Sequence, residues 1–75
     1  MSKPELLDLV NELWEEVLGE APSAPDADFF DDGGTSLSAV SLTFLLEDRS
    51  GVPVPLAVLL SDGTPEGLAR HLAAA

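Results

Sequence analysis

The sequence contains no cysteine and no tyrosine, a single histidine and only three basic residues. Without cysteine, the chain cannot form disulfides, bind a metal through thiolates or use a cysteine nucleophile. It has no apolar run of about 20 residues, the length needed to cross a bilayer. Its first residues also lack the basic and apolar segments of a signal peptide. We therefore expect a soluble, cytoplasmic protein.

Charge of one sign dominates the chain. Fourteen acidic residues against three basic ones give a net charge of -11. This charge repels nucleic acids and anionic membranes, so we expect neither as a partner. We expect partner proteins with basic surfaces, and we expect the protein itself to be a monomer. High acidity can also indicate disorder, but the 45% hydrophobic content and its helical spacing favour a packed core.

The length of 75 residues allows one small core, and we expect a single domain over residues 1–75. A deep enzymatic cleft is not expected in so short a chain. The chain begins with methionine and ends soon after its last predicted helix, which favours a free-standing protein, although a domain excised from a longer chain has the same appearance.

Helical spacing and end signals predict an all-α fold, a small bundle of three main helices and one short helix. We expect helices over about residues 4–18 and 36–49, a short helical turn near 56–60, and a last helix from residue 65. The first helix places a repeating apolar stripe at Leu6, Val10, Leu13, Trp14, Val17 and Leu18. The start and end signals are Ser2 with Glu5, Gly19, Gly51, and Thr64 with Pro65.

Residues 20–35 show neither helical nor strand periodicity and are predicted to form a long loop. Loops of this length are usually functional or held down by their own side chains. Phe29 and Phe30 are the expected anchors, since burying at least one of them fixes the position of the glycines that follow.

The second helix carries two apolar stripes on nearly opposite sides. Ala39, Leu42 and Leu46 form one stripe, and Leu37, Val40 and Phe44 form the other. Two interpretations stay open at this point. Either the helix is central and buried all round, or one stripe is exposed and marks a partner surface.

Ser36 is the most distinctive residue of the chain, because it follows two glycines at the expected start of a helix. Free backbone N–H groups and the helix dipole favour an anionic group there, such as a phosphoester. The side chains missing at Gly33 and Gly34 leave room for another protein's active site to approach the hydroxyl. Equally, Thr35 or Ser36 fits the role of a helix cap, and both roles can hold together.

Other chemistries fit the sequence poorly. The glycines lack the lysine and spacing of a nucleotide-binding P-loop. Asp28 and Asp32 match two positions of a calcium-binding EF-hand loop, but Phe30 and Ala39 stand where ligands are needed. A serine hydrolase would pair Ser36 with His71, the only histidine, yet no nucleophile-elbow motif surrounds Ser36. We expect no metal site and no catalysis.

The segment Asp28–Ala39, with the sequence DFFDDGGTSLSA, resembles the core motif of the peptidyl carrier (thiolation) proteins of nonribosomal peptide synthesis. The first helix, with Leu13, Trp14 and Val17, and the closing segment from Thr64 through Leu72 are also similar to the pattern of this family. The resemblance therefore covers nearly the whole chain.

The resemblance implies a four-helix carrier of the acyl-carrier-protein kind. In such a carrier, Ser36 receives 4′-phosphopantetheine from coenzyme A through a phosphopantetheinyl transferase, and the arm then holds an aminoacyl, peptidyl or acyl thioester. Loading (adenylation) and downstream condensation or tailoring enzymes are the further partners that it implies. It also assigns Leu37, Val40 and Phe44 to partner binding, and Ala39, Leu42 and Leu46 to the core. The motif around the attachment serine comprises Asp32, Gly33, Gly34, Thr35 and Leu37.

Two residues depart from the usual family pattern. Asp32 replaces a leucine before the glycines, and Thr35 stands where histidine or aspartate is common. These departures leave open an acyl carrier of the polyketide or fatty-acid type. A cofactor-free helical interaction module is the alternative from a different functional class.

Overall fold

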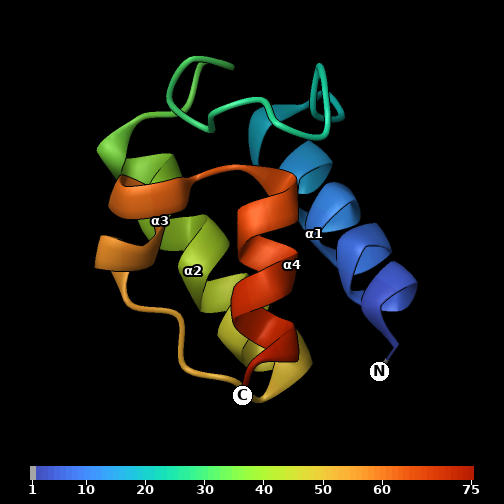
Figure 1. The fold of residues 1–75 in the computed structure, drawn as a ribbon. Helices are drawn as coiled ribbons and strands as arrows, with labels where there is room; N and C mark the ends of the chain where they lie inside the picture. Colours follow the sequence, from blue (N-terminus) through green and yellow to red (C-terminus); the bar gives the residue numbers. More distant parts are fainter. Residues whose placement is uncertain (1) are drawn as a thin grey trace.

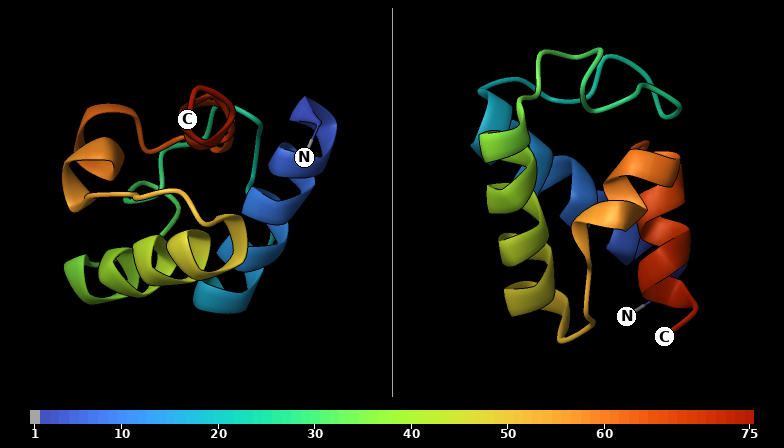
Figure 2. Two further views of the ribbon diagram at one scale, coloured as in Figure 1. Left: turned by 90° about the horizontal axis from the view of Figure 1, so that it is seen from below. Right: turned by 90° about the vertical axis from the view of Figure 1, so that its left-hand side faces the viewer.

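The computed structural model describes residues 2–75 and contains four helices and no strand within that range. The helices are α1 (Lys3–Leu18), α2 (Ser36–Ser50), α3 (Leu56–Asp62) and α4 (Pro65–Ala73) (Figure 1). Helix α1 packs against both α4 and α2, and the short α3 contacts α2 and α4 (Figure 2). The predicted all-α bundle is confirmed.

Local capping groups set the helix boundaries close to the predicted positions. The Ser2 hydroxyl accepts a hydrogen bond from the backbone N–H of Glu5, and the Thr64 hydroxyl accepts one from Gly67. Gly19 and Gly51 follow the last residues of α1 and α2 as C-caps, and their left-handed backbone suits glycine. Helix α2 runs one residue beyond the predicted Arg49, and α3 continues two residues beyond Leu60, as far as the residue before Gly63.

One hydrophobic core joins all four helices and the long loop. The ring of Trp14 packs edge-on against Phe29, with ring centroids 5.0 Å apart. Leu9 of α1 is also buried, although the predicted stripe omits it, whereas Val17 and Leu18 are only partly buried. The buried apolar side chains are Leu6, Leu9, Val10, Leu13, Trp14, Phe29, Ala39, Leu42, Leu46, Val54, Leu59, Leu68, Ala69 and Leu72.

The predicted loop between α1 and α2 covers one end of the bundle, and the chain termini lie at the opposite end (Figures 1 and 2). Phe29 is fully buried, and Phe30 packs partly against the core. The backbone N–H of Phe29 donates to the carbonyl of Gly63 at 2.8 Å, so the loop is also fixed to the turn before α4. The prediction that the phenylalanines anchor this loop is confirmed.

The segment between α2 and α3 is extended and contains two prolines, Pro53 and Pro55. Val54 between them is buried and holds the segment against the core. Within residues 2–75, no helix combines the length and the apolar character that crossing a bilayer requires.

Candidate functional site

A reciprocal pair of hydrogen bonds caps the N-terminus of α2. The Thr35 hydroxyl accepts from the backbone N–H of Ser38 at 3.2 Å, and the Ser38 hydroxyl accepts from the backbone N–H of Thr35 at 2.7 Å. Thr35 has the extended backbone of an N-cap residue. Of the two caps considered from the sequence, Thr35 is therefore the one that the structure shows.

Ser36 is the first residue of α2, and its side chain is exposed. Within residues 2–75, its hydroxyl makes no hydrogen bond, in contrast to the hydroxyls of Thr35 and Ser38 on either side. The backbone N–H groups of Ser36 and Leu37 also have no acceptor in this range, as expected in the first turn of a helix. The site thus combines a free hydroxyl with N–H groups that favour an anion.

The two glycines before Ser36 have internal structural roles. Gly33 has a φ of +102°, a conformation that glycine adopts without strain. A Cβ atom at Gly34 would lie 2.4 Å from the ring of Phe29 and 2.7 Å from its backbone carbonyl oxygen, so no side chain fits there unless the backbone shifts as well as the ring. Gly34 therefore allows the backbone that leads to Ser36 to lie directly on the loop's main anchor.

The aspartates of the loop organise its backbone. One oxygen of Asp28 accepts from the N–H groups of Phe30 and Asp31, at 3.0 and 3.2 Å. The Asp32 carboxylate accepts from the hydroxyl of Ser23 at 2.7 Å and from its backbone N–H at 3.0 Å. These bonds from Ser23 lower the pKa of Asp32. Within the described residues, no three potential metal-binding side chains come together.

The two stripes of α2 have opposite environments. Ala39, Leu42 and Leu46 are completely buried. Leu37, Val40 and Phe44 are 79%, 48% and 72% exposed. The interpretation of α2 as a helix buried all round is therefore wrong, because no element within residues 2–75 covers its second face. An exposed apolar face begins one residue after Ser36.

Helix α3 adds exposed leucines that the sequence reasoning did not assign. Leu60 is 68% exposed and Leu56 is 36% exposed, whereas Leu59 is buried. Leu56, Leu59 and Leu60 stand at the i, i+3 and i+4 spacing of a single helical face, so helical spacing gave no signal that two of them are exposed. Helix α3 itself packs against α2.

His71 does not meet Ser36. Its Nε2 lies 2.8 Å from the carbonyl oxygen of Pro53. This contact is near the C-terminal end of α4, whereas Ser36 starts α2 at the end covered by the loop (Figures 1 and 2). The pairing needed by a serine hydrolase is absent from residues 2–75.

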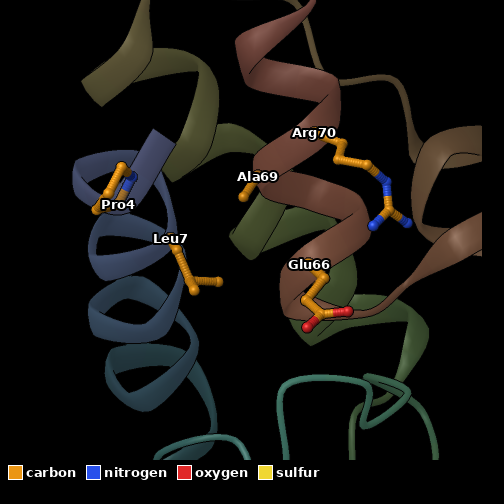
Figure 3. A pocket seen from close by; sticks show the side chains of 5 residues that line it. All are labelled: Pro4, Leu7, Glu66, Ala69 and Arg70. Atoms are coloured by element: carbon orange, nitrogen blue, oxygen red, sulfur yellow. The ribbon is translucent and has the colours of Figure 1, made fainter. Parts of the chain in front are cut away.

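A groove of about 470 Å³ lies between α1 and α4, where Leu7 points toward α4 (Figure 3). Arg70 also borders it, but its guanidinium extends toward α3 and pairs with Asp62 at 3.0 Å. None of the lining residues belongs to α2, so this groove is separate from the Ser36 site.

Comparison with known proteins gives a consistent result. A family profile described as the phosphopantetheine attachment site matches residues 8–72. Phosphinothricin tripeptide synthetase PhsC of Streptomyces viridochromogenes is 40% identical over 97% of this chain. Tyrocidine synthase 3 of Brevibacillus parabrevis is 44% identical over 84% of this chain. The chain spans only 7% and 1% of the lengths of these two relatives.

A solved structure shares the fold. The solution structure of a peptidyl carrier protein, described as a prototype for the peptidyl carrier domains of modular peptide synthetases, aligns with a TM-score of 0.80 and 32% identity. The alignment covers 91% of this chain and 90% of that one. With the four-helix fold and the profile match, this likeness shows that the chain belongs to the phosphopantetheine attachment site family as a peptidyl carrier protein domain.

Proposed function

We propose that Ser36 is the residue that carries the phosphopantetheine arm. The observation that supports this most strongly is that the Ser36 hydroxyl has no hydrogen-bond partner in the described part of the chain, whereas the hydroxyls of Thr35 and Ser38 near it both cap α2. In the proposed transfer, the Ser36 oxygen attacks the pantetheine-bearing phosphorus of coenzyme A, and a new phosphoester bond forms as the P–O bond to the nucleotide portion breaks. The hydroxyl proton passes to a base of the transferase, and the nucleotide portion of coenzyme A leaves.

The N-terminus of α2 suits the charge of such a phosphoester. The free N–H groups of Ser36 and Leu37 and the positive end of the helix dipole stabilise a negative group by about 0.3–1 kcal/mol at an exposed position. The Asp32 carboxylate, which would repel a phosphate, is held by Ser23. Helix α2 has 15 residues, so its dipole is well developed.

The attached arm supplies a terminal thiol that holds an acyl or aminoacyl group as a thioester. The protein's own part is to present the arm and to dock the enzymes that act on the cargo. We propose that Leu37, Val40 and Phe44 form this docking face, with Leu60 of α3 extending it. Exposed apolar side chains next to the attachment point can be covered by a partner that reaches the arm.

The relatives are peptide synthetases, and we propose that the partners of this domain are a phosphopantetheinyl transferase, an adenylation or other loading enzyme, and condensation or tailoring enzymes. The domain itself is proposed to be non-catalytic, a single domain over residues 1–75, and monomeric in the cytoplasm. A polyketide-type cargo stays the alternative, because a hybrid PKS-NRPS synthetase from Acremonium is also 40% identical over 77% of this chain.

The exposed stripe of α2 also supports a second candidate, a helical interaction module that works without an arm. The two functions differ in their dependence on Ser36. A module without the arm binds its partner enzymes equally well before and after modification and keeps its activity in cells when Ser36 is replaced by alanine.

Intact-mass spectrometry after incubation with coenzyme A and a broad-specificity phosphopantetheinyl transferase tests the attachment. We expect one added arm on the unaltered protein and on Ser38→Ala, and none on Ser36→Ala. Circular dichroism shows whether each variant is folded. An unmodified folded protein, or an adduct that survives Ser36→Ala, contradicts the proposal.

A further inference from the structure

Trp14 has an unsatisfied polar group in the core. The residue is completely buried, and its indole N–H has no hydrogen-bond acceptor within residues 2–75. A buried N–H group without a partner is costly, and such groups usually bind ordered water when no protein acceptor is near. The environment of this one nitrogen therefore calls for a physical explanation.

Trp14 borders a small polar cavity of about 80 Å³, together with Asp32, Ser23, Leu18, Glu20 and Ala21. The cavity exceeds the volume that one water molecule requires. The Asp32 carboxylate at the cavity wall already accepts two hydrogen bonds from Ser23 and has lone pairs left for another donor. Glu20 is the other ionisable group at the cavity wall.

The lowered pKa of Asp32 is consistent with this arrangement. The hydroxyl and then the backbone N–H of Ser23 are the main causes, burial opposes them, and the Trp14 indole makes a smaller lowering contribution. The indole nitrogen and the Asp32 carboxylate border the same cavity, and within residues 2–75 no direct hydrogen bond of ordinary geometry joins them. One bridging water accounts for both observations.

We propose that Asp32 is a positioning residue for Ser36, which ties the loop to α1 by binding Ser23 directly and the Trp14 indole through a water held in this cavity. The tie joins three parts of the chain that are far apart in sequence: α1, the start of the loop and the segment before Ser36. Its effect on arm transfer rests on the proposed attachment at Ser36, whereas the tie itself does not.

The path from Asp32 to Ser36 is short. Gly33, Gly34 and the N-cap residue Thr35 intervene, and the ring of Trp14 packs against Phe29, on which Gly34 lies. The buried Phe29 ring holds the loop against the core, and the proposed contacts of Asp32 hold it against α1. Releasing the tie lets the two glycines move, so the hydroxyl of Ser36 is presented in more orientations to a modifying enzyme.

NMR of the unmodified protein tests the tie directly, because the single tryptophan gives a single indole N–H signal. We expect a cross-peak from this proton to a long-lived water. Asp32→Ala should shift the signal and speed its exchange with solvent, and Ser23→Ala should act in the same direction. Asp26→Ala is the matched control, since it removes the same charge from an exposed position of the same loop.

Transfer kinetics test the positioning role. We expect Asp32→Ala to lower kcat/KM for phosphopantetheinyl transfer to Ser36 by about tenfold. Ser23→Ala should lower it less, Asp32→Asn should recover part of the loss, and Asp26→Ala should leave it unchanged.

Three results overturn the proposal. They are an indole signal that shows no water and does not respond to Asp32→Ala, equal transfer rates for Asp32→Ala and the unaltered protein, and a rate loss in Asp32→Ala that Ser23→Ala does not share. The last result would mean that Asp32 contacts the transferase itself. If the unaltered protein accepts no arm at all, the proposed attachment fails, and the indole measurement still decides the tie.

Discussion

The two faces of α2 have similar apolar residues and opposite environments. Leu42 and Leu46 are completely buried by α1 and the rest of the core, whereas Leu37 and Phe44 on the other side are mostly exposed. Burying a large apolar side chain is worth about 1.5–3 kcal/mol. The buried face therefore stabilises the fold, whereas the exposed face retains apolar surface that a partner can cover.

At the first turn of α2, residues that stabilise the fold also lie beside a residue that is available for function. Thr35 and Ser38 bind each other and begin the helix, whereas the hydroxyl of Ser36 has no hydrogen-bond partner among residues 2–75. Stability and function thus lie on different residues of one helix.

The largest effect is expected in the core. Leu42→Ala should lower the free energy of unfolding by about 2–5 kcal/mol, because it removes a fully buried side chain and leaves a cavity. Phe44→Ala on the exposed face should change it by less than about 0.5 kcal/mol. Urea unfolding followed by Trp14 fluorescence measures both, and equal losses would show that the two faces do not differ as described.

The next effect concerns docking. Phe44→Ala should reduce kcat/KM for phosphopantetheinyl transfer about tenfold, which corresponds to about 1.4 kcal/mol. Leu60→Ala then shows whether the docking face extends to α3, since a similar loss requires that the transferase covers both helices. An unchanged rate in Phe44→Ala, with the protein folded, would remove this side chain from the docking face.

The helix cap is expected to matter less. Thr35→Ala should cost about 1 kcal/mol, because the N–H group of Ser38 loses its acceptor. In a domain of this size, that cost lowers Tm by about 4–8 °C. Ser36→Ala should leave Tm nearly unchanged, and thermal unfolding followed by circular dichroism compares the two. A larger loss in Ser36→Ala would mean that Ser36 has a structural role.

The smallest effect concerns the charge around the exposed face. With a net charge of -11, the domain should associate with a basic partner surface more weakly as salt rises. The Debye length falls from about 10 Å at 0.1 M to about 3 Å at 1 M ionic strength, so the KM of the transferase should increase over this range. A KM that does not change with salt would show that docking is mainly apolar.

The separation of structural from functional residues in α2 could largely be predicted from the sequence, because the signals for it are local. The caps at Thr35 and Thr64 and the glycines after α1 and α2 lie within a few residues of the groups that they satisfy. The two stripes of α2 follow from helical periodicity. The choice of Leu37, Val40 and Phe44 as the exposed stripe followed from the family resemblance, and the structure bears out their exposure.

The remaining features depend on contacts between distant residues. Asp32 binds Ser23 nine positions away, and Gly34 is required by the ring of Phe29. The sequence pattern presents Asp32 as a departure before the glycines and gives no sign of its partner. Likewise, the two glycines suggested clearance for a modifying enzyme, whereas the structure shows internal reasons for both.

The central claim is that the arm is attached at Ser36 and at no neighbouring hydroxyl. Fragmentation mass spectrometry of the transferase-treated protein locates the modified residue among Thr35, Ser36, Ser38 and Ser41. We predict the whole phosphopantetheine mass on Ser36. Modification of any of the other three residues, or of none, would contradict the account.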